Sequence, residues 1–106
     1  LVDIPRMAEK SSAMLRKSLD ALVKRSTDMA YEVLNSDDDV DALYDQVYRE
    51  LLMLMIQEPK AIQRGTYLLW AAHDLERIAD RATNIAEQVV YLVTGSTVEK
   101  GKIYKD

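Results

Sequence analysis

The chain has no cysteine, only three glycines and two prolines in 106 residues, and no apolar run long enough to cross a membrane. The lack of cysteine excludes disulfides, thiolate metal sites and cysteine nucleophiles, and it is compatible with a reducing compartment. So little glycine and proline favours long helices over strands joined by turns. The formal net charge of −4 provides no basic field for nucleic acid. We therefore expect neither nucleic-acid binding nor membrane insertion.

The first of three long helices is predicted from residue 3 or 4 to about residue 34. Pro5 falls in its first turn, where a missing N–H costs nothing. Asn35 and Ser36 both favour caps and turns, so we expect them to end this helix.

The second helix is predicted from residue 37 to residue 57 or 58, because Pro59 disfavours helix in the residue before it. Pro59 can then open the third helix, which should continue to about residue 94 and stop at Gly95. Helices of this length with such short connections must fold back on one another.

The sequence thus predicts an all-α fold, an antiparallel up-down-up three-helix bundle, as one domain over residues 1–95. A loosely ordered tail is expected over residues 96–106. Ser11, Ser12 and Ser18 are interpreted as hydroxyls on the outer side of the first helix. The expected core is the set of apolar residues spaced three or four apart: Ile4, Met7, Met14, Leu15, Leu19, Leu22, Met29, Val33, Val40, Leu43, Val47, Leu51, Leu54, Leu75, Ile78, Ala82, Ile85, Val89 and Leu92.

One face of the third helix carries oxygen-bearing side chains at a spacing of four residues. Glu76, Asp80 and Asn84 form one column, nearly opposite the apolar seam of the same helix. The second helix offers a matching pair, Asp41 and Asp45. Counted from the turn between the two helices, the two acidic pairs differ in height by about 4.5 Å, which Asp and Glu side chains can bridge.

Four carboxylates at one level repel each other, at a cost on the order of 1 kcal/mol. A bound cation would turn this repulsion into a net attraction, and carboxylate oxygens suit hard ions such as magnesium, manganese, calcium or iron. The alternative is a group of solvated acids, with Asp37 and Asp41 stabilised by the dipole at the start of the second helix. The spacing leaves both interpretations open.

His73, the only histidine, is interpreted as a surface or network residue rather than a ligand. It lacks the Glu-x-x-His spacing of dimetal carboxylate bundles, so an enzyme of that class is disfavoured. The run from Tyr67 to Trp70 spreads apolar character around the third helix. Core packing is the default explanation for this run, and a packing surface for another bundle is the alternative.

The segment L-E-R-I-A-D-R-A-T-N-I-A-E, preceded by D-x-x-x-D on the second helix, resembles the signature of the PhoU family of phosphate-transport regulators. The opening L-V-D-I-P-R-M-A-E is similar to the start of the second of the two three-helix repeats in that family. The resemblance covers the whole chain but only half of a typical member. Ala79 stands where relatives often have glycine, a small substitution that should preserve close packing.

The resemblance implies a non-enzymatic cytoplasmic regulator at the inner face of the membrane. Such proteins act as adaptors between the ATPase subunit of the phosphate ABC transporter and a membrane sensor histidine kinase, and they repress the phosphate-starvation response when phosphate is plentiful. The alternative is a structural or oligomerisation module without a metal, for instance a PhoU-like domain attached to a sodium–phosphate cotransporter. A lone half is expected to form a homodimer that replaces the missing repeat; the alternative is that it is an excised domain.

The resemblance also implies a cofactor. Some members hold a divalent metal or iron, in multinuclear clusters on paired acidic motifs. The matching positions here are Asp41 and Asp45 on the second helix and Glu76 and Asp80 on the third, with Asn84 continuing the column.

Overall fold

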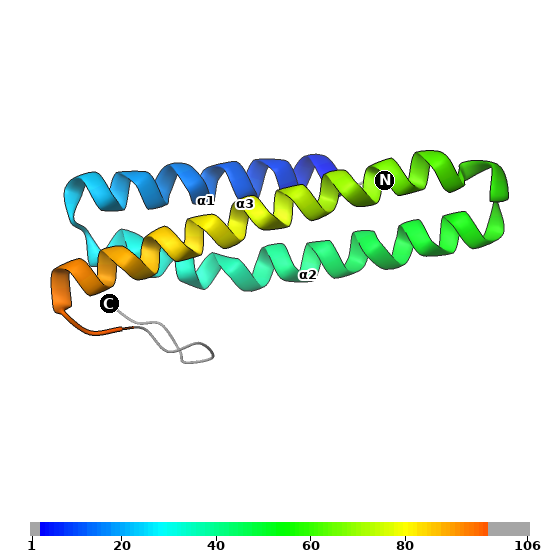
Figure 1. Ribbon diagram of the computed structural model, residues 1–106. Helices are drawn as coiled ribbons and strands as arrows, with labels where there is room; N and C mark the ends of the chain where they lie inside the picture. Colours follow the sequence, from blue (N-terminus) through cyan, green and yellow to red (C-terminus); the bar gives the residue numbers. More distant parts are fainter. Residues whose placement is uncertain (1–2, 98–106) are drawn as a thin grey trace.

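A computed structural model describes residues 3–97, which form three long helices packed side by side (Figure 1). Helix α1 covers Ile4–Lys24, α2 covers Thr27–Gln57 and α3 covers Ile62–Thr94, with a short 3-10 turn, η1, at Pro59–Ala61. Each helix packs against both others, and no strand occurs within this range. The predicted all-α three-helix bundle is confirmed.

The turn between α1 and α2 is made by Arg25 and Ser26. Arg25 adopts the left-handed conformation (φ 55°, ψ 41°), and its N–H donates to the carbonyl of Leu22 at 3.3 Å. The N–H of Ser26 donates to the carbonyl of Ala21 at 3.0 Å. Ser26 also caps α2, because its Oγ accepts a hydrogen bond from the N–H of Met29 at 3.2 Å. A two-residue turn therefore satisfies the ends of both helices.

The predicted break at Asn35 and Ser36 is wrong, since both residues lie inside α2. Ser36 is accommodated in the helix because its hydroxyl donates back to the carbonyl of Glu32 at 2.9 Å. The first helix thus ends at Lys24 rather than near residue 34. The acidic run Asp37–Asp39 consequently lies in the middle of α2, beyond the reach of the N-terminal dipole that was expected to stabilise it.

The turn between α2 and α3 lies where the sequence predicted it. Helix α2 ends at Gln57, and Glu58 is extended (φ −132°) ahead of Pro59. The chain then forms η1 for one turn, so the α-helix proper begins at Ile62. Gly95 (φ 77°) ends α3 in the left-handed conformation that glycine adopts without strain.

The core lies where α1 covers the groove between α2 and α3. Its inner stripe on α1 is Met7, Ser11, Met14, Ser18 and Ala21, spaced four and three residues apart. Ser11 and Ser18 are fully buried, so their predicted outward position is wrong. The buried residues contributed by α2 and α3 are Ala30, Val33, Leu34, Val40, Val47, Leu51, Ala72, Ala79, Ala82, Ala86, Val89 and Val90.

Three residues predicted for the core are exposed instead: Leu19, Leu22 and Leu92, at 46, 37 and 54%. The stripe on α1 explains two of them, because it runs through Ser18 and Ala21 and turns the neighbouring leucines outward. The close packing expected at Ala79 is borne out by its complete burial.

Helices α2 and α3 extend beyond the beginning of α1. Helix α1 has 21 residues and α2 has 31, so the end of α2 that leads into η1 has no α1 beside it (Figure 1). Ten residues of helix correspond to about 15 Å. Tyr67 and Trp70 lie on this part of α3, 56 and 61% exposed, with their rings edge-to-face at 5.6 Å. The default interpretation of these two aromatics as core is therefore wrong.

Within residues 3–97, no helix combines the length and the apolar character needed to cross a bilayer. Of the tail predicted over residues 96–106, only residues 96 and 97 belong to the described part, and the rest of that prediction lies outside it.

Candidate functional site on the open face of α2 and α3

The contact between Tyr44 and His73 fixes how α2 lies along α3. Their ring centroids are 6.4 Å apart. Because the two helices are antiparallel, three residues back along α2 and three residues forward along α3 lead to Asp41 and Glu76. These two residues therefore lie across from each other, on the side of the helix pair turned away from α1, which we call the open face.

One helical turn further along, Asp37 lies across from Asp80. The pKa of the Asp37 carboxyl is raised from 3.8 to about 6, first by burial and then by the charges of Asp41, Asp80, Asp38 and Glu76, in that order. One of its oxygens, Oδ1, is buried with no hydrogen-bond partner. The fold thus holds a half-buried carboxylate among like charges.

Glu76 is in a similar position on α3. Burial raises the pKa of its carboxyl, and Asp80 and Asp41 raise it further, whereas His73 lowers it and Asp45 adds a smaller raising effect. Acids from both helices therefore act on one carboxyl. The structure brings Asp41, Glu76 and Asp80 together, with Asp45 at the margin of the group.

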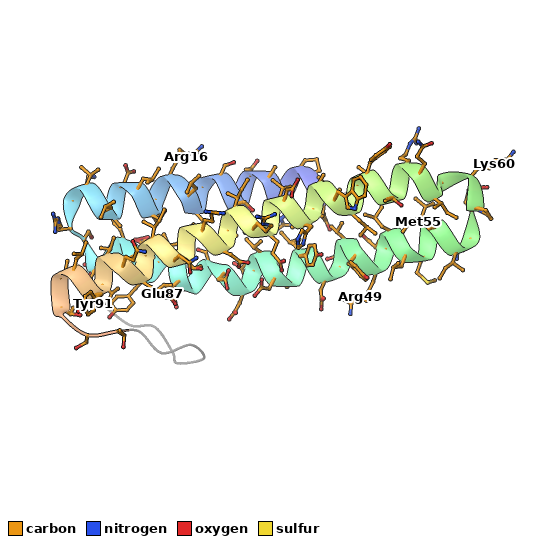
Figure 2. All side chains as sticks on the ribbon, viewed as in Figure 1. Arg16, Arg49, Met55, Lys60, Glu87 and Tyr91 are labelled. Carbon is orange, nitrogen blue, oxygen red and sulfur yellow. The ribbon has the colours of Figure 1, made fainter. Side chains whose placement is uncertain are left out.

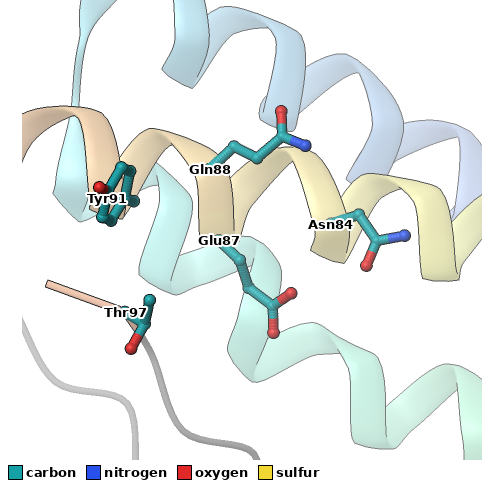
Figure 3. A pocket seen from close by; sticks show the side chains of 5 residues that line it. All are labelled: Asn84, Glu87, Gln88, Tyr91 and Thr97. Atoms are coloured by element: carbon teal, nitrogen blue, oxygen red, sulfur yellow. The ribbon is translucent and has the colours of Figure 1, made fainter.

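Asn84, the fifth predicted site residue, lies one turn beyond Asp80 near the far end of α3. It is exposed and lines a shallow open hollow of about 480 Å³ (Figure 3). The other residues that line this hollow are Glu87, Gln88, Tyr91 and Thr97.

The donor chemistry of the acidic group fits a hard cation, which prefers carboxylate oxygens. The unpartnered Oδ1 of Asp37 is an acceptor that a cation would satisfy. As the side chains stand, however, no three histidine or acidic residues within the range 3–97 are arranged to hold one ion. Metal binding would therefore require acidic side chains of this group to change orientation.

Asp37 was not among the predicted metal ligands, although burial and neighbouring charges raise the pKa of its carboxyl to about 6. Its spacing of four from Asp41 was visible in the sequence, and it extends the column on α2. The misplaced break at residues 35–36 hid its significance, because it put Asp37 at a helix start where a negative charge is stabilised.

The fold and this face define a helical-bundle module that presents an acidic strip along two neighbouring helices, made by Asp37, Asp41, Asp45, Glu76 and Asp80. Residues 4–89 match the PhoU domain, and the chain belongs to that family. The resemblance stated from the sequence is thus confirmed.

Several phosphate-specific transport system accessory protein PhoU homologs are similar to this chain. The one from Clostridium acetobutylicum is 43% identical over 97 residues, which cover 92% of this chain and 44% of that protein. PhoU homolog 2 from Thermotoga maritima is 42% identical over 106 residues, covering 100% of this chain and 44% of that protein. The homolog from Pseudomonas aeruginosa is 39% identical over 97 residues, which cover 92% of this chain and 40% of that protein. The chain spans less than half the length of these curated relatives.

Proposed function

We propose that this PhoU-family module regulates phosphate transport and phosphate-starvation signalling without catalysing a reaction. It acts in the cytoplasm at the inner face of the membrane, as an adaptor between the ATPase subunit of the phosphate ABC transporter and a sensor histidine kinase. It represses the starvation response when phosphate is plentiful. The proposal is supported by family membership and by relatives named as accessory proteins of phosphate-specific transport.

The acidic strip supplies this module with a site for a divalent metal or iron, mononuclear or in a cluster. Its ligands are Asp41, Asp45, Glu76 and Asp80, with Asn84 at one end, and we add Asp37 to them. The observation that carries the proposal is the half-buried Asp37 carboxylate, which has one unpartnered oxygen and is surrounded by like charges from two helices. A ligand at 100 times its dissociation constant contributes about 2.7 kcal/mol, more than the repulsion of about 1 kcal/mol that it relieves.

The metal role is tested with Glu76→Gln combined with Asp80→Asn, which preserve side-chain size. Elemental analysis after loading with manganese or iron should show metal in the native chain and a loss of it in the double variant. Far-ultraviolet circular dichroism should be unchanged. The control is Asp20→Asn, which removes an exposed carboxylate on α1. Equal metal content in all three proteins would exclude a metal site here.

The adaptor role is tested separately, by co-purification of the transporter ATPase subunit and the kinase with the full-length protein. Both should be retained by the native protein. Retention of neither, with or without phosphate and metal, would contradict the adaptor role while leaving the metal result intact.

A structural or oligomerisation module, such as a PhoU-like domain attached to a sodium–phosphate cotransporter, is the second candidate. It is favoured by the large apolar side chains exposed at both ends of the bundle, among them Val23, Ile56 and Trp70. It predicts a homodimer that forms without metal and has no affinity for the transporter ATPase. Analytical ultracentrifugation in the presence of a chelator distinguishes it from the adaptor.

A further inference from the structure

We propose that the open face of α2 and α3 is a docking surface for a basic amphipathic helix of a partner protein. Apolar side chains of that helix would lie on Tyr48, Leu52, Ile56 and Ile62, which we call the loop-end patch. Its basic side chains would lie over the acidic strip. The inference goes beyond the regulatory role proposed above and does not depend on a metal.

The loop-end patch is an exposed apolar column. Tyr48, Leu52 and Ile56 are spaced four apart on α2 and are 42, 37 and 76% exposed. Ile62, just across η1 at the start of α3, is 51% exposed. Side chains of this size and exposure each leave on the order of 100 Å² of apolar surface in water. Their sum is in the range of patches that mark interaction sites on soluble proteins.

The bundle itself does not cover this patch. The patch lies on the face turned away from α1, and within residues 3–97 only α2 and α3 run through this end of the bundle (Figure 1). The interface between those two helices is already filled. Met55 lies against Gly65, where an added Cβ would come within 2.7 Å of the Met55 Cγ and Sδ, and Thr66 also contacts Met55. The patch is therefore surplus apolar surface outside the α2–α3 contact.

Charge identifies the occupant. The column on α2 that carries the patch continues directly into Asp45, Asp41 and Asp37, so one face is apolar at the loop end and acidic beyond it. A second copy of this chain, with its own acidic strip and a formal charge of −4, would bring like charges together. A basic amphipathic helix would instead form ion pairs with the acidic strip and bury the loop-end patch under its apolar face, as amphipathic helices do when they bind hydrophobic surfaces.

The same charges fix the direction of the docked helix. The basic residues Arg49 and Lys60 lie toward the loop end (Figure 2). Basic side chains of the partner would be repelled there and attracted to the acidic strip. The apolar part of the partner helix is thus placed at η1 and the basic part over Asp41 and Glu76.

The test uses an 18-residue tryptophan-free peptide, with leucines on one helical face and lysines confined to one half. Trp70 is the only tryptophan of the chain and is 61% exposed on the part of α3 that extends beyond α1, so its fluorescence reports on this end of the bundle. With a chelator present, the peptide should shift the Trp70 emission to shorter wavelength and protect it from acrylamide. A peptide in which glutamates replace the lysines should bind at least tenfold more weakly.

Matched variants separate this surface from general stickiness. Ile56→Ser combined with Ile62→Ser should weaken peptide binding at least tenfold, whereas Val23→Ser, 81% exposed at the far end of α1, should change it less than twofold. Asp45→Asn with Asp80→Asn should weaken binding at least threefold at low salt, and Asp20→Asn with Asp28→Asn less than twofold.

Absence of binding, equal binding of the glutamate peptide, or equal weakening by Val23→Ser would overturn the proposal. So would a peptide-free dimer that the two isoleucine variants dissociate, because the occupant would then be a second copy. Loss of metal binding in the earlier test would leave this result unaffected, since the titration is done without metal.

Discussion

The two faces of the α2–α3 pair are formed by the same two helices but differ in burial and in charge. The face under α1 is packed with alanines and valines, and Ala79, Ala82 and Ala86 are fully buried there. The open face carries half-buried acids whose pKa values are raised, together with exposed isoleucine and tyrosine side chains. Packing on the covered face therefore stabilises the fold, whereas the open face exposes charge and apolar surface at a cost in stability.

The largest difference should appear between two methionines. Met7 of α1 is fully buried over the covered face, and Met53 of α2 is 56% exposed. Met7→Ala should lower the free energy of unfolding by about 3 kcal/mol, because it removes buried methylenes and leaves a cavity. Met53→Ala should change it by less than about 0.5 kcal/mol. Urea denaturation measures both, and similar losses would contradict the division into two faces.

The next effect is a gain of stability on the open face. Asp37→Asn removes the half-buried charge, so the free energy of unfolding at pH 7 should rise by about 1–2 kcal/mol, after a discount for partial solvent screening. Asp20→Asn, at an exposed position on α1, is the control and should have little effect.

The pH dependence gives this prediction its sign. The folded-state pKa of Asp37 is raised from 3.8 to about 6, so the ionised carboxyl destabilises the fold above pH 6. As the pH falls from 6 to below 4, the Asp37 carboxyl of the unsubstituted protein becomes protonated and its destabilising effect is lost. The higher free energy of unfolding of Asp37→Asn relative to the unsubstituted protein then disappears. An advantage that grows on acidification would show that the pKa of Asp37 is not raised. If a metal binds at this site, manganese at pH 7 should reduce the difference in free energy of unfolding between Asp37→Asn and the unsubstituted protein.

A smaller contrast lies within the covered face. Ser11 and Ser18 are both fully buried on α1, but the hydroxyl of Ser18 donates to the carbonyl of Leu15 at 2.7 Å, whereas Ser11 Oγ has no partner. Ser11→Ala should raise the free energy of unfolding by about 1 kcal/mol, since an unsatisfied buried hydroxyl is costly. Ser18→Ala should be close to neutral. A loss in Ser11→Ala would mean that its hydroxyl is satisfied after all.

The sequence located the acidic face because that prediction depended on the turn at Pro59. Proline restricts the residue before it, so the end of α2 could be assigned, and counting outward from there placed Asp41 near Glu76. The covered face of α3 was likewise readable from helical periodicity, as the burial of Ala82 and Val89 shows.

The first turn was not readable in the same way. Arg25 takes a left-handed conformation that glycine or asparagine usually adopts, so the residue type at this position does not predict the turn. Asn35 and Ser36 have turn propensity, but tertiary packing along α2 overrides it. Because the length of α1 depends on this turn, neither the uncovered loop end nor the mid-helix position of Asp37 could be predicted.

The smallest predicted effect concerns the outer edge between α1 and α2. Lys17 Nζ lies 2.9 Å from Glu32 Oε1, and both side chains are about half exposed. In a double-mutant cycle with Lys17→Ala and Glu32→Ala, the coupling energy should be about 0.2–1 kcal/mol and should fall as salt is added, because solvent screens an exposed pair. A salt-insensitive coupling as large as the loss in Met7→Ala would mean that surface ion pairs, not packing beneath α1, hold the first helix in place.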